Sequence, residues 1–126
     1  AAADVVVVEG AGGWRVPLHP DGFLSDLPEL LGLDVLLGVG LRLGCLNHAR
    51  LTLEAIERSG RCRCVGWIGN RIDPAFARLD ENLATLTRLL GGPALAVIPP
   101  LPAATAAATV EHLDHPALAR LLGLPT

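Results

Sequence analysis

Glu9 is the first residue of this sequence whose type and position could do chemistry. It follows an uninterrupted β-branched run, residues 5–8, and precedes the glycine-containing stretch 10–13. An apolar strand that ends in an acid is typical of a site where a carboxylate orders Mg²⁺ beside nucleotide phosphates. The same pattern arises when an acid merely keeps a strand end solvated. Glu9 by itself leaves both interpretations open.

Asn70 and Arg71 follow a second apolar run, residues 65–69. The amide of Asn70 offers both a donor and an acceptor, which suits the edge of a purine. Arg71 could bind a ligand beside it, or could form a surface ion pair with Asp73, which is the commoner fate of such neighbours. The stretch IPPLP, residues 98–102, presents a rigid apolar wall that could stack against a nucleobase or simply close a loop.

The stretch GLRLGCLNHA, residues 40–49, is a third candidate because it contains a predicted helix start. Backbone N–H groups of Gly44, Cys45 and Leu46 would lie at that start, where they and the helix dipole attract an anion. Such N–H bonds contribute about 1.5–3 kcal/mol each, and the dipole only about 0.3–1 kcal/mol. We therefore expect the amides to dominate in holding a carboxylate. Asn47 could add a donor or cap the helix, and the residues alone favour the cap.

Four strand-then-helix units are expected to position these residues. Strands are predicted at residues 4–9, 34–39, 63–69 and 94–98. Helices are predicted at 25–31, 46–59 and 78–90, and the start of a last helix is marked by Asp114, His115 and Pro116. Ser25 or Asp26 is expected to cap the first helix and Gly60 to end the second. Alternating strands and helices predict an α/β fold, a parallel sheet with helices on both faces. The candidate residues would then meet at one edge of the sheet.

Two helices carry apolar stripes that are expected to face the core, namely Leu46, Ala49, Leu53 and Ile56 and then Leu79, Leu83, Leu86 and Leu90. The alanine-rich tract AATAAAT, residues 103–109, is predicted to be a mobile loop. The four histidines, at positions 19, 48, 112 and 115, share no metal-ligand spacing, and we assign them no catalytic role. His48 is read as a surface or packing residue and His115 as part of a cap.

The amino-acid composition argues against several classes of function. A chain of 126 residues has room for one domain with a moderate core. A formal charge of −3 with scattered basic residues gives no reason to expect nucleic acid as a partner. Four prolines within the uncharged stretch 89–110 would break a membrane-spanning helix, and neither end looks like a signal or transit peptide. The three cysteines fit free thiols in a reducing cytosol better than a disulfide framework or a zinc site.

Four stretches taken together, VEGAGGWRVPL, VGLRLGCLNHARLT, GWIGNRIDP with ENLATL, and IPPLP, resemble the carboxyl-terminal half of dethiobiotin synthetases. The resemblance covers nearly the whole chain and weakens after Leu101. It implies that residues 1–126 form one partial domain of a P-loop NTPase-like ligase that depends on ATP and Mg²⁺. Such a ligase joins CO₂ to 7,8-diaminopelargonic acid and closes a ureido ring in biotin synthesis, and the resemblance implies a cytoplasmic homodimer.

The resemblance also implies roles for individual residues. Glu9 matches the magnesium-associated acid, and the glycines after it match residues that line the phosphates and the reacting amine. Asn70 matches the adenine-reading residue, and the start of the helix in GCLNHA matches the segment that receives the substrate's distant carboxylate across the homodimer interface. The implied ATP-binding residues are Glu9, Gly10, Ala11, Gly12, Asn70, Arg71, Pro99, Pro100 and Leu101. The implied substrate-binding residues are Gly44, Cys45, Leu46 and Asn47, so Cys45 need not be a nucleophile.

One departure from the family pattern concerns the phosphate loop. In the family, the glycine-rich phosphate loop with its lysine precedes the matched region, and all ten basic residues of this chain are arginine. The chain also has no methionine, so we expect a fragment or a processed piece that is inactive alone and holds no catalytic residue. After Leu101, where the family often has an acid, the sequence offers Pro102 and small residues up to Thr109. A P-loop ligase of cobalamin synthesis, a partition-type ATPase and a non-enzymatic dimerisation fragment are the alternatives.

Overall fold

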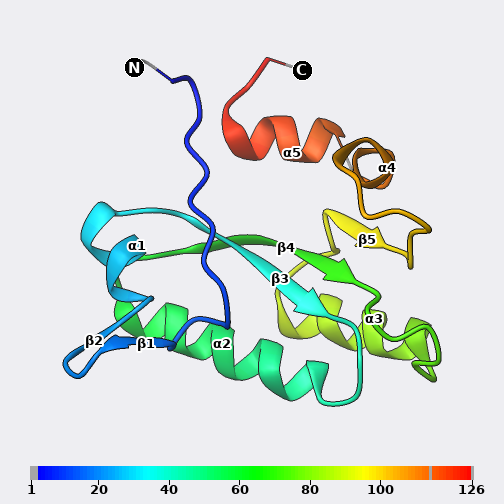
Figure 1. The fold of residues 1–126 in the computed structure, drawn as a ribbon, viewed down its shortest axis with the longest axis horizontal. Helices are drawn as coiled ribbons and strands as arrows, with labels where there is room; N and C mark the ends of the chain where they lie inside the picture. The colour runs from blue at the N-terminus through cyan, green and yellow to red at the C-terminus, as the bar shows by residue number, and fades with distance from the viewer. Residues whose placement is uncertain (1–2, 114, 126) are drawn as a thin grey trace.

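The computed structural model describes residues 3–113 and 115–125, and its centre is a three-stranded parallel sheet (Figure 1). The strand order is β3 (Val35–Gly40), β4 (Cys64–Asn70) and β5 (Ala96–Ile98). Gly40 pairs with Asn70, and Asn70 pairs with Ile98. The carboxyl ends of the three strands therefore lie in line at one edge of the sheet, as predicted.

Helices α2 (Cys45–Ser59) and α3 (Leu79–Leu89) connect these strands and lie on one side of the sheet in Figure 1. A short hairpin and a short helix precede β3, and two further helices follow β5 on the other side of the sheet in the same view. These elements are β1 (Pro17–His19), β2 (Gly22–Phe23), α1 (Asp26–Leu31), α4 (Ala106–Val110) and α5 (His115–Leu122). The predicted α/β class is confirmed. The predicted start of the last helix at Asp114 lies outside the described residues.

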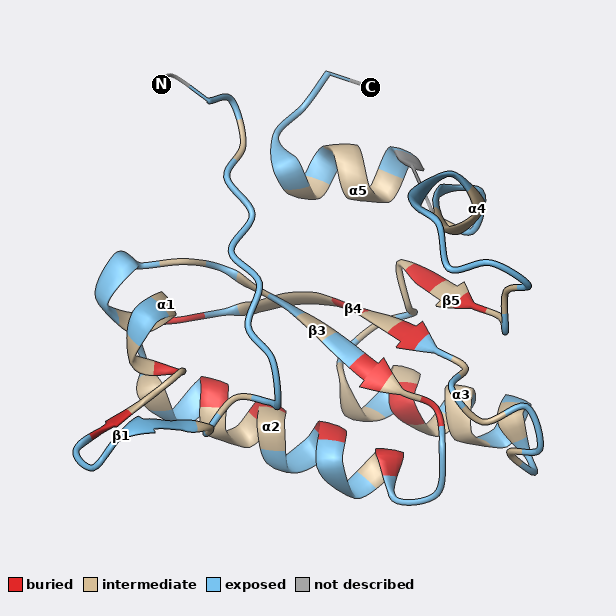
Figure 2. Cartoon of the chain, viewed as in Figure 1, coloured by how far each residue is buried: buried red, intermediate tan, exposed pale blue. Residues whose placement is uncertain are grey.

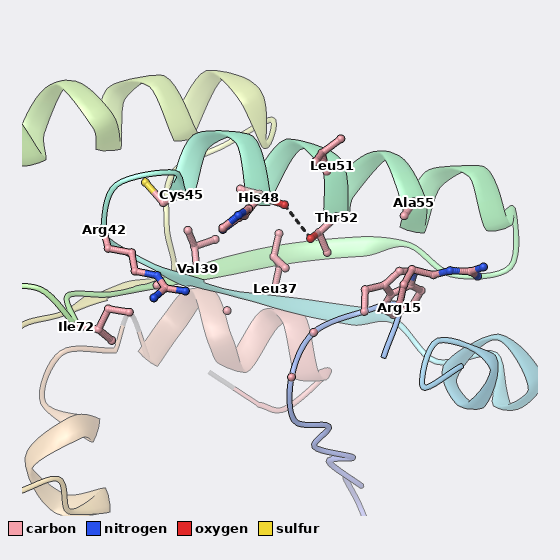
Figure 3. A pocket seen from close by; sticks show the side chains of 16 residues that line it. Arg15, Leu37, Val39, Arg42, Cys45, His48, Leu51, Thr52, Ala55 and Ile72 are labelled. Carbon is pink, nitrogen blue, oxygen red and sulfur yellow. Dashed lines mark hydrogen bonds between the residues drawn. The ribbon is translucent and has the colours of Figure 1, made fainter. Parts of the chain in front are cut away.

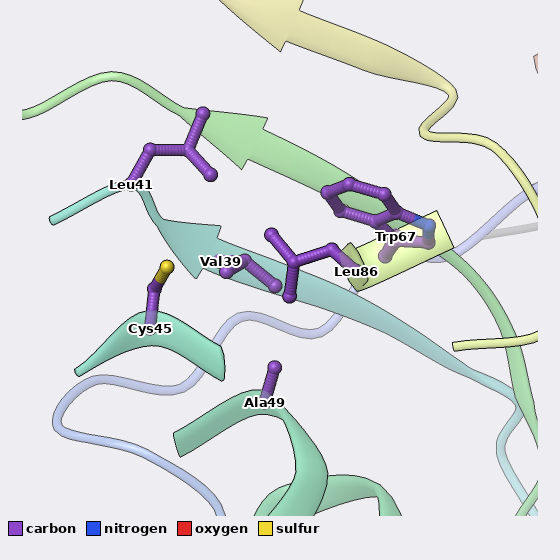
Figure 4. Packing of buried hydrophobic residues seen from close by; sticks show 6 residues of the cluster. All are labelled: Val39, Leu41, Cys45, Ala49, Trp67 and Leu86. Atoms are coloured by element: carbon purple, nitrogen blue, oxygen red, sulfur yellow. The ribbon is translucent and has the colours of Figure 1, made fainter. Parts of the chain in front are cut away.

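A compact set of side chains forms the core between the sheet and helices α2 and α3 (Figures 2 and 4). Trp67 of β4 is its largest member, 2% exposed, and its indole Nε1 donates to the carbonyl of Gly92 at 2.8 Å. The predicted stripes are confirmed in outline, because Ala49, Leu53 and Ile56 are buried on α2 and Leu86 is buried on α3. Cys45 rather than Leu46 is the buried residue at the start of the α2 stripe.

The end of α2 follows the predicted signal, whereas the start of α1 does not. Gly60 ends α2 in the left-handed region, φ 65°, where a side chain would be strained, and its N–H donates to the carbonyl of Glu57. Ser25 occupies the position before α1, but its side chain makes no capping hydrogen bond. The carboxylate of Asp26 instead accepts from the backbone N–H of Phe23 at 2.7 Å, which ties the helix to the preceding hairpin.

The predicted strand at residues 4–9 was wrong. This segment is not part of any described strand, and Val6, Val7 and Val8 are 74%, 82% and 55% exposed. A strand needs a hydrogen-bonded neighbour, and the described sheet ends at β3 without reaching these residues. The apolar run has the composition of a buried strand and lacks the partner that would bury it.

The predicted mobile loop at residues 103–109 was also wrong in part. Residues 106–110 form the short helix α4, and the hydroxyl of Thr105 accepts from the N–H of Ala108 at 3.2 Å at its start. Alanine has the highest intrinsic helix propensity, and threonine is a favourable cap. The tract therefore has local reasons to be helical. None of the helices in the described ranges is long and apolar enough to cross a membrane.

All three cysteines are free thiols, as predicted; Cys45 and Cys62 are buried and Cys64 is partly buried. Burial raises the pKa of the Cys64 thiol above its ordinary value of 9.0. The folded state therefore holds this thiol protonated at pH values where the unfolded chain ionises it. The contribution of the protonated Cys64 thiol to the free energy of unfolding is fully present below pH 9.0. It is lost as the pH rises through the folded-state pKa.

We expect the free energy of unfolding to fall between pH 8 and pH 10.5, and to fall less in Cys64→Ala. Urea titrations followed by circular dichroism at both pH values measure the difference. Thr85→Ala serves as the non-titrating control, because the Thr85 hydroxyl donates to the carbonyl of Glu81 on α3, and it is expected to show the same pH dependence as the parent chain. An equal loss of stability in Cys64→Ala and the parent chain would contradict the assignment.

Candidate nucleotide-binding site

A groove of about 730 Å³ lies at the carboxyl ends of the three strands; we call it the strand-end groove. Its walls come from the amino-terminal segment, β3, the turns after β4 and β5, and the region of α4. Six of the predicted ATP-binding residues line it, namely Glu9, Asn70, Arg71, Pro99, Pro100 and Leu101. The structure thus brings together side chains as far apart in the sequence as those of Glu9 and Leu101.

Arg71 has the most distinctive environment in this groove. Its backbone N–H donates to the carbonyl of Ile98 at 2.9 Å, and its Nη2 donates to the carbonyl of Pro74 at 2.8 Å. These bonds fix the guanidinium, but Nε is buried and has no hydrogen-bond partner among the described residues. A buried donor without an acceptor costs about 1–3 kcal/mol. A ligand acceptor placed against Nε would remove that cost.

The alternative of an ion pair between Arg71 and Asp73 is not realised. The carboxylate of Asp73 accepts from the backbone N–H of Ala75 at 2.9 Å, which shapes the turn after β4. No ion pair joins these two side chains in the described parts of the chain. Arg71 is therefore positioned by backbone carbonyls and keeps its charge available to the groove.

Asn70 is the last residue of β4, and its backbone is held from two sides. Its carbonyl accepts from Leu41 at 2.7 Å and from Ile72 at 2.9 Å, while its side chain is exposed. A rigid backbone with an exposed amide suits the recognition of a flat polar edge. Pro99 and Leu101 are partly buried in the same groove and provide apolar surface beside it.

A second hollow, of about 610 Å³, lies beside α2 and is shown in Figure 3; we call it the helix-side pocket. Of the predicted site residues, only Gly12 and Cys45 line it. The charged side chains in its lining are Arg15 and Arg42, and His48 of α2 lines it too; no carboxylate among the described residues does. Arg15 lies 4.1 Å from the ring centre of Phe23. The sequence reasoning did not single out these basic residues, although Arg42 lies inside the GLRLG motif.

The start of α2 differs from expectation in two ways. Gly44 precedes the helix with φ 92°, a conformation that favours glycine, and has no side chain with which to cap. Asn47 lies within the first turn, so the predicted cap by Asn47 was wrong. The N–H of Cys45 donates to the carbonyl of Arg42 at 3.0 Å, which leaves fewer amides for an anion than predicted. Gly44, Leu46 and Asn47 line neither hollow.

Gly10 and Ala11 also lie outside the lining of both hollows. A Cβ atom at Gly10 would collide with the side chain of Leu24, so packing explains the glycine at this position. Gly12 has φ 89° and lies at the helix-side pocket. The glycine-rich stretch after Glu9 therefore has structural reasons for its composition, and its role near phosphates stays a prediction.

The side chains of the strand-end groove fit a magnesium ion only if a bound nucleotide supplies further ligands. In residues 3–113 and 115–125, no group of three or more His, Cys, Asp or Glu side chains could hold a metal ion. Among the described residues, Glu9 is the single carboxylate that lines the strand-end groove. Mg²⁺ is commonly held by one or two carboxylates together with substrate phosphates and water. One carboxylate in the same groove as the unpartnered Arg71 Nε fits a magnesium–nucleotide complex better than a protein-held metal.

Comparisons with known proteins agree with this arrangement. The sequence profile of the AAA domain family matches residues 1–108. An ATP-dependent dethiobiotin synthetase, BioD, from Pseudomonas aeruginosa (strain UCBPP-PA14) is 55% identical over 112 residues, which are 89% of this chain and 49% of that protein. A protein of the same name from Ralstonia nicotianae is 54% identical to this chain over 119 residues, which are 94% of this chain and 52% of that protein. A protein of the same name from Cellvibrio japonicus is 51% identical to this chain over 112 residues, which are 89% of this chain and 49% of that protein.

The chain spans about half the length of the curated relatives it matches. The identities confirm the resemblance to dethiobiotin synthetases, and the parallel sheet with its connecting helices is consistent with part of a P-loop NTPase-like fold. The chain belongs to the AAA domain family, and its curated homologues are ATP-dependent dethiobiotin synthetases.

Proposed function

We propose that this chain is part of an ATP-dependent dethiobiotin synthetase. The whole protein would join CO₂ to 7,8-diaminopelargonic acid and close the ureido ring. The observation that carries the proposal is the identity of 51% or more to relatives of that name over about nine-tenths of the chain. The strand-end groove adds chemical support, because residues from three strand ends and from the amino-terminal segment meet in it.

Within this proposal, the strand-end groove receives ATP. Asn70 binds the edge of the adenine, and Pro99 and Leu101 pack against its face. The buried Nε of Arg71 donates to an acceptor on the nucleotide, which satisfies its missing hydrogen bond. Glu9 holds the magnesium ion that accompanies the phosphates. When bound, that ion neutralises charge on the phosphoryl oxygens.

The start of α2 is proposed to receive the distant carboxylate of the diamine substrate. The residues at the amino end of this 15-residue helix are Gly44, Cys45, Leu46 and Asn47, and the dipole and the first amides there favour an anion. The site is proposed to be completed by the second copy of a homodimer. Three free thiols suit a reducing compartment, and we place the whole protein in the cytoplasm.

The proposal is tested by phosphate release from ATP in the full-length protein. Phosphate release is expected to require 7,8-diaminopelargonate together with bicarbonate and Mg²⁺. A monoamine that lacks the neighbouring second amine serves as the control and is expected to give no ring-closed product. Phosphate release at the same rate without the diamine would favour a different ATPase reaction and contradict the proposal.

Replacing Asn70 tests the adenine-reading role. Asn70→Ala in the full-length protein is expected to raise the Kd for ATP about tenfold, because one or two hydrogen bonds are lost. The preference for ATP over GTP is expected to shrink with it. Calorimetric titration with both nucleotides measures the two effects.

Asn82→Ala is the matched control for this experiment. Asn82 lies on α3, and its side-chain amide donates to the carbonyl of Arg78 at 2.8 Å, outside both hollows. Its replacement is expected to leave the Kd for ATP unchanged. If Asn70→Ala bound both nucleotides as the parent protein does, the adenine would have to lie elsewhere.

A further inference from the structure

The loop between β4 and α3, residues 71–78, is held by hydrogen bonds around Asp73 (Figure 1). The carboxylate of Asp73 accepts from the backbone N–H of Ala75 at 2.9 Å, and its backbone carbonyl accepts from the N–H of Phe76 at 3.2 Å. A bond from an aspartate side chain to the N–H two residues on is a common way to fix a turn. The turn here begins directly after two residues that line the strand-end groove, Asn70 and Arg71.

One peptide group links Asp73 to Arg71. The carbonyl of Pro74 and the N–H of Ala75 belong to the same planar, trans peptide, so they point in opposite directions. The Asp73 carboxylate holds the N–H end of this peptide, and Nη2 of Arg71 donates to its carbonyl end at 2.8 Å. A peptide plane that is fixed at its N–H cannot easily turn its carbonyl away. The bond at the N–H also polarises the carbonyl, which strengthens the bond from Arg71.

The guanidinium of Arg71 has a further donor that no protein group uses. Its Nε is buried and has no partner in the described part of the chain. A guanidinium is planar, so a fixed Nη2 and a fixed backbone together restrict the direction of Nε. The backbone of Arg71 is held by the 2.9 Å bond from its N–H to the carbonyl of Ile98. The direction of the unused donor therefore depends on the Pro74 carbonyl.

We propose that Asp73 is a positioning residue for nucleotide binding and acts on Arg71 through the Pro74–Ala75 peptide. This inference rests on the proposed function, because the acceptor that meets Nε is taken to belong to the ATP of that reaction. Asp73 is absent from the lining of the strand-end groove, so its effect is indirect. It keeps the Nε donor of Arg71 aimed before ATP arrives, and binding then has less to order.

The charge of Asp73 makes positioning distinguishable from electrostatics. A carboxylate near a groove that receives a polyanion repels the ligand, so removal of the charge alone would tighten ATP binding. Loss of the acceptor would instead free the peptide and weaken ATP binding. Asp73→Ala removes both the charge and the acceptor, whereas Asp73→Asn removes the charge and keeps an acceptor oxygen. The two effects therefore have opposite signs in this pair of variants.

Calorimetric titration of the full-length protein with ATP and Mg²⁺ measures the effect. Asp73→Ala is expected to raise the Kd for ATP about fivefold, because part of the contribution of the charged Arg71 donor is lost. Asp73→Asn is expected to bind ATP at least as tightly as the parent protein. In steady-state assays the KM for ATP should rise in Asp73→Ala, while kcat and the KM for the diamine stay within about twofold of the parental values.

A double-mutant cycle tests whether Asp73 acts through Arg71. Arg71→Met removes the guanidinium and is expected to raise the Kd for ATP at least about tenfold. Adding Asp73→Ala to Arg71→Met should change the Kd by less than about twofold, because the peptide then has no guanidinium to position. A loop that merely folded less well would weaken ATP binding in both backgrounds. Phe76, which packs against the core cluster and donates to a backbone carbonyl, keeps the loop anchored in Asp73→Ala.

Asp80→Ala is the matched control for the loss of charge. Asp80 is an exposed carboxylate in the first turn of α3, and it lines neither hollow. Its replacement removes the same charge as Asp73→Ala. It should leave the Kd for ATP within about twofold of the parental value, as most surface substitutions do.

Three results would overturn the positioning role. They are a Kd for ATP in Asp73→Ala at or below the parental value, an equal weakening in Asp73→Asn and Asp73→Ala, and the full effect of Asp73→Ala in the Arg71→Met background. The outcome for the proposed function is separate, because the readout is ATP affinity. A protein that bound ATP with the expected pattern but formed no dethiobiotin would contradict the proposed function and support the role of Asp73. A synthetase whose Asp73→Ala variant bound ATP as the parent does would do the reverse.

Discussion

Trp67→Ala is expected to destabilise the chain by about 3–5 kcal/mol, the largest loss of stability that a single substitution should cause. Trp67 is 2% exposed and packs within the cluster that joins the sheet to α2 and α3. Its removal leaves a large cavity and deprives the Gly92 carbonyl of its 2.8 Å donor. Small domains are stable by only about 5–15 kcal/mol. The variant should therefore unfold at a much lower urea concentration than the parent chain and with a less cooperative transition.

Two companion variants separate packing from hydrogen bonding. Trp67→Phe keeps most of the ring and loses the N–H donor, so an intermediate loss of about 1–2 kcal/mol is expected. Trp14→Ala changes a partly exposed residue outside the core cluster and should have the smallest effect. Urea unfolding followed by far-ultraviolet circular dichroism distinguishes the three. Equal stability of Trp67→Ala and the parent chain would mean that the cluster does not hold the fold together.

Glu9→Gln in the full-length protein is expected to lower kcat by about a hundredfold or more. The substitution keeps the size of the side chain and removes the only carboxylate that the described part of the chain places in the lining of the strand-end groove. Loss of one group that organises charge in a phosphoryl-transfer site commonly costs about two or three powers of ten. The activity is also expected to need a higher Mg²⁺ concentration. Steady-state kinetics at several Mg²⁺ concentrations measure both effects.

Asp21→Asn is the control for this substitution. Asp21 is an exposed carboxylate in the hairpin between β1 and β2, and it lines neither hollow. Its replacement changes net charge by the same amount and should leave kcat within about twofold, as most surface substitutions do. A Glu9→Gln protein with parental kcat and Mg²⁺ dependence would show that the metal-associated acid is another residue.

The elements that the sequence predicted well are those whose signals are local. The α2 stripe and the glycine at position 60 led to a predicted helix at residues 46–59, and the structure places it at Cys45–Ser59. Strands β3 and β4 also lie within one residue of the predicted bounds. Residues 5–8 have an equally strong local pattern but form no strand. Burial of a strand depends on partners elsewhere in the sheet, which the pattern of one segment cannot supply.

The strand-end groove could be predicted because parallel strands deliver their carboxyl ends to one edge. Asn70 and Pro99 follow two such strands, and the alignment of Asn70 with Ile98 brings them together. The helix-side pocket could not be predicted in this way. Its lining comes from one face of α2, one edge of β3 and the loop at residues 12–15, and only the packing of the chain places Arg15 opposite Arg42.

Mass spectrometry of the product is the most direct test of the central claim. Full-length protein is incubated with ATP, Mg²⁺, 7,8-diaminopelargonate and carbon-13 bicarbonate, alongside this chain alone. We expect labelled dethiobiotin from the full-length protein and none from the chain alone, which has no lysine among its ten basic residues. Full-length protein that consumes ATP without forming labelled dethiobiotin would contradict the assignment, and labelled product from the chain alone would contradict its predicted inactivity.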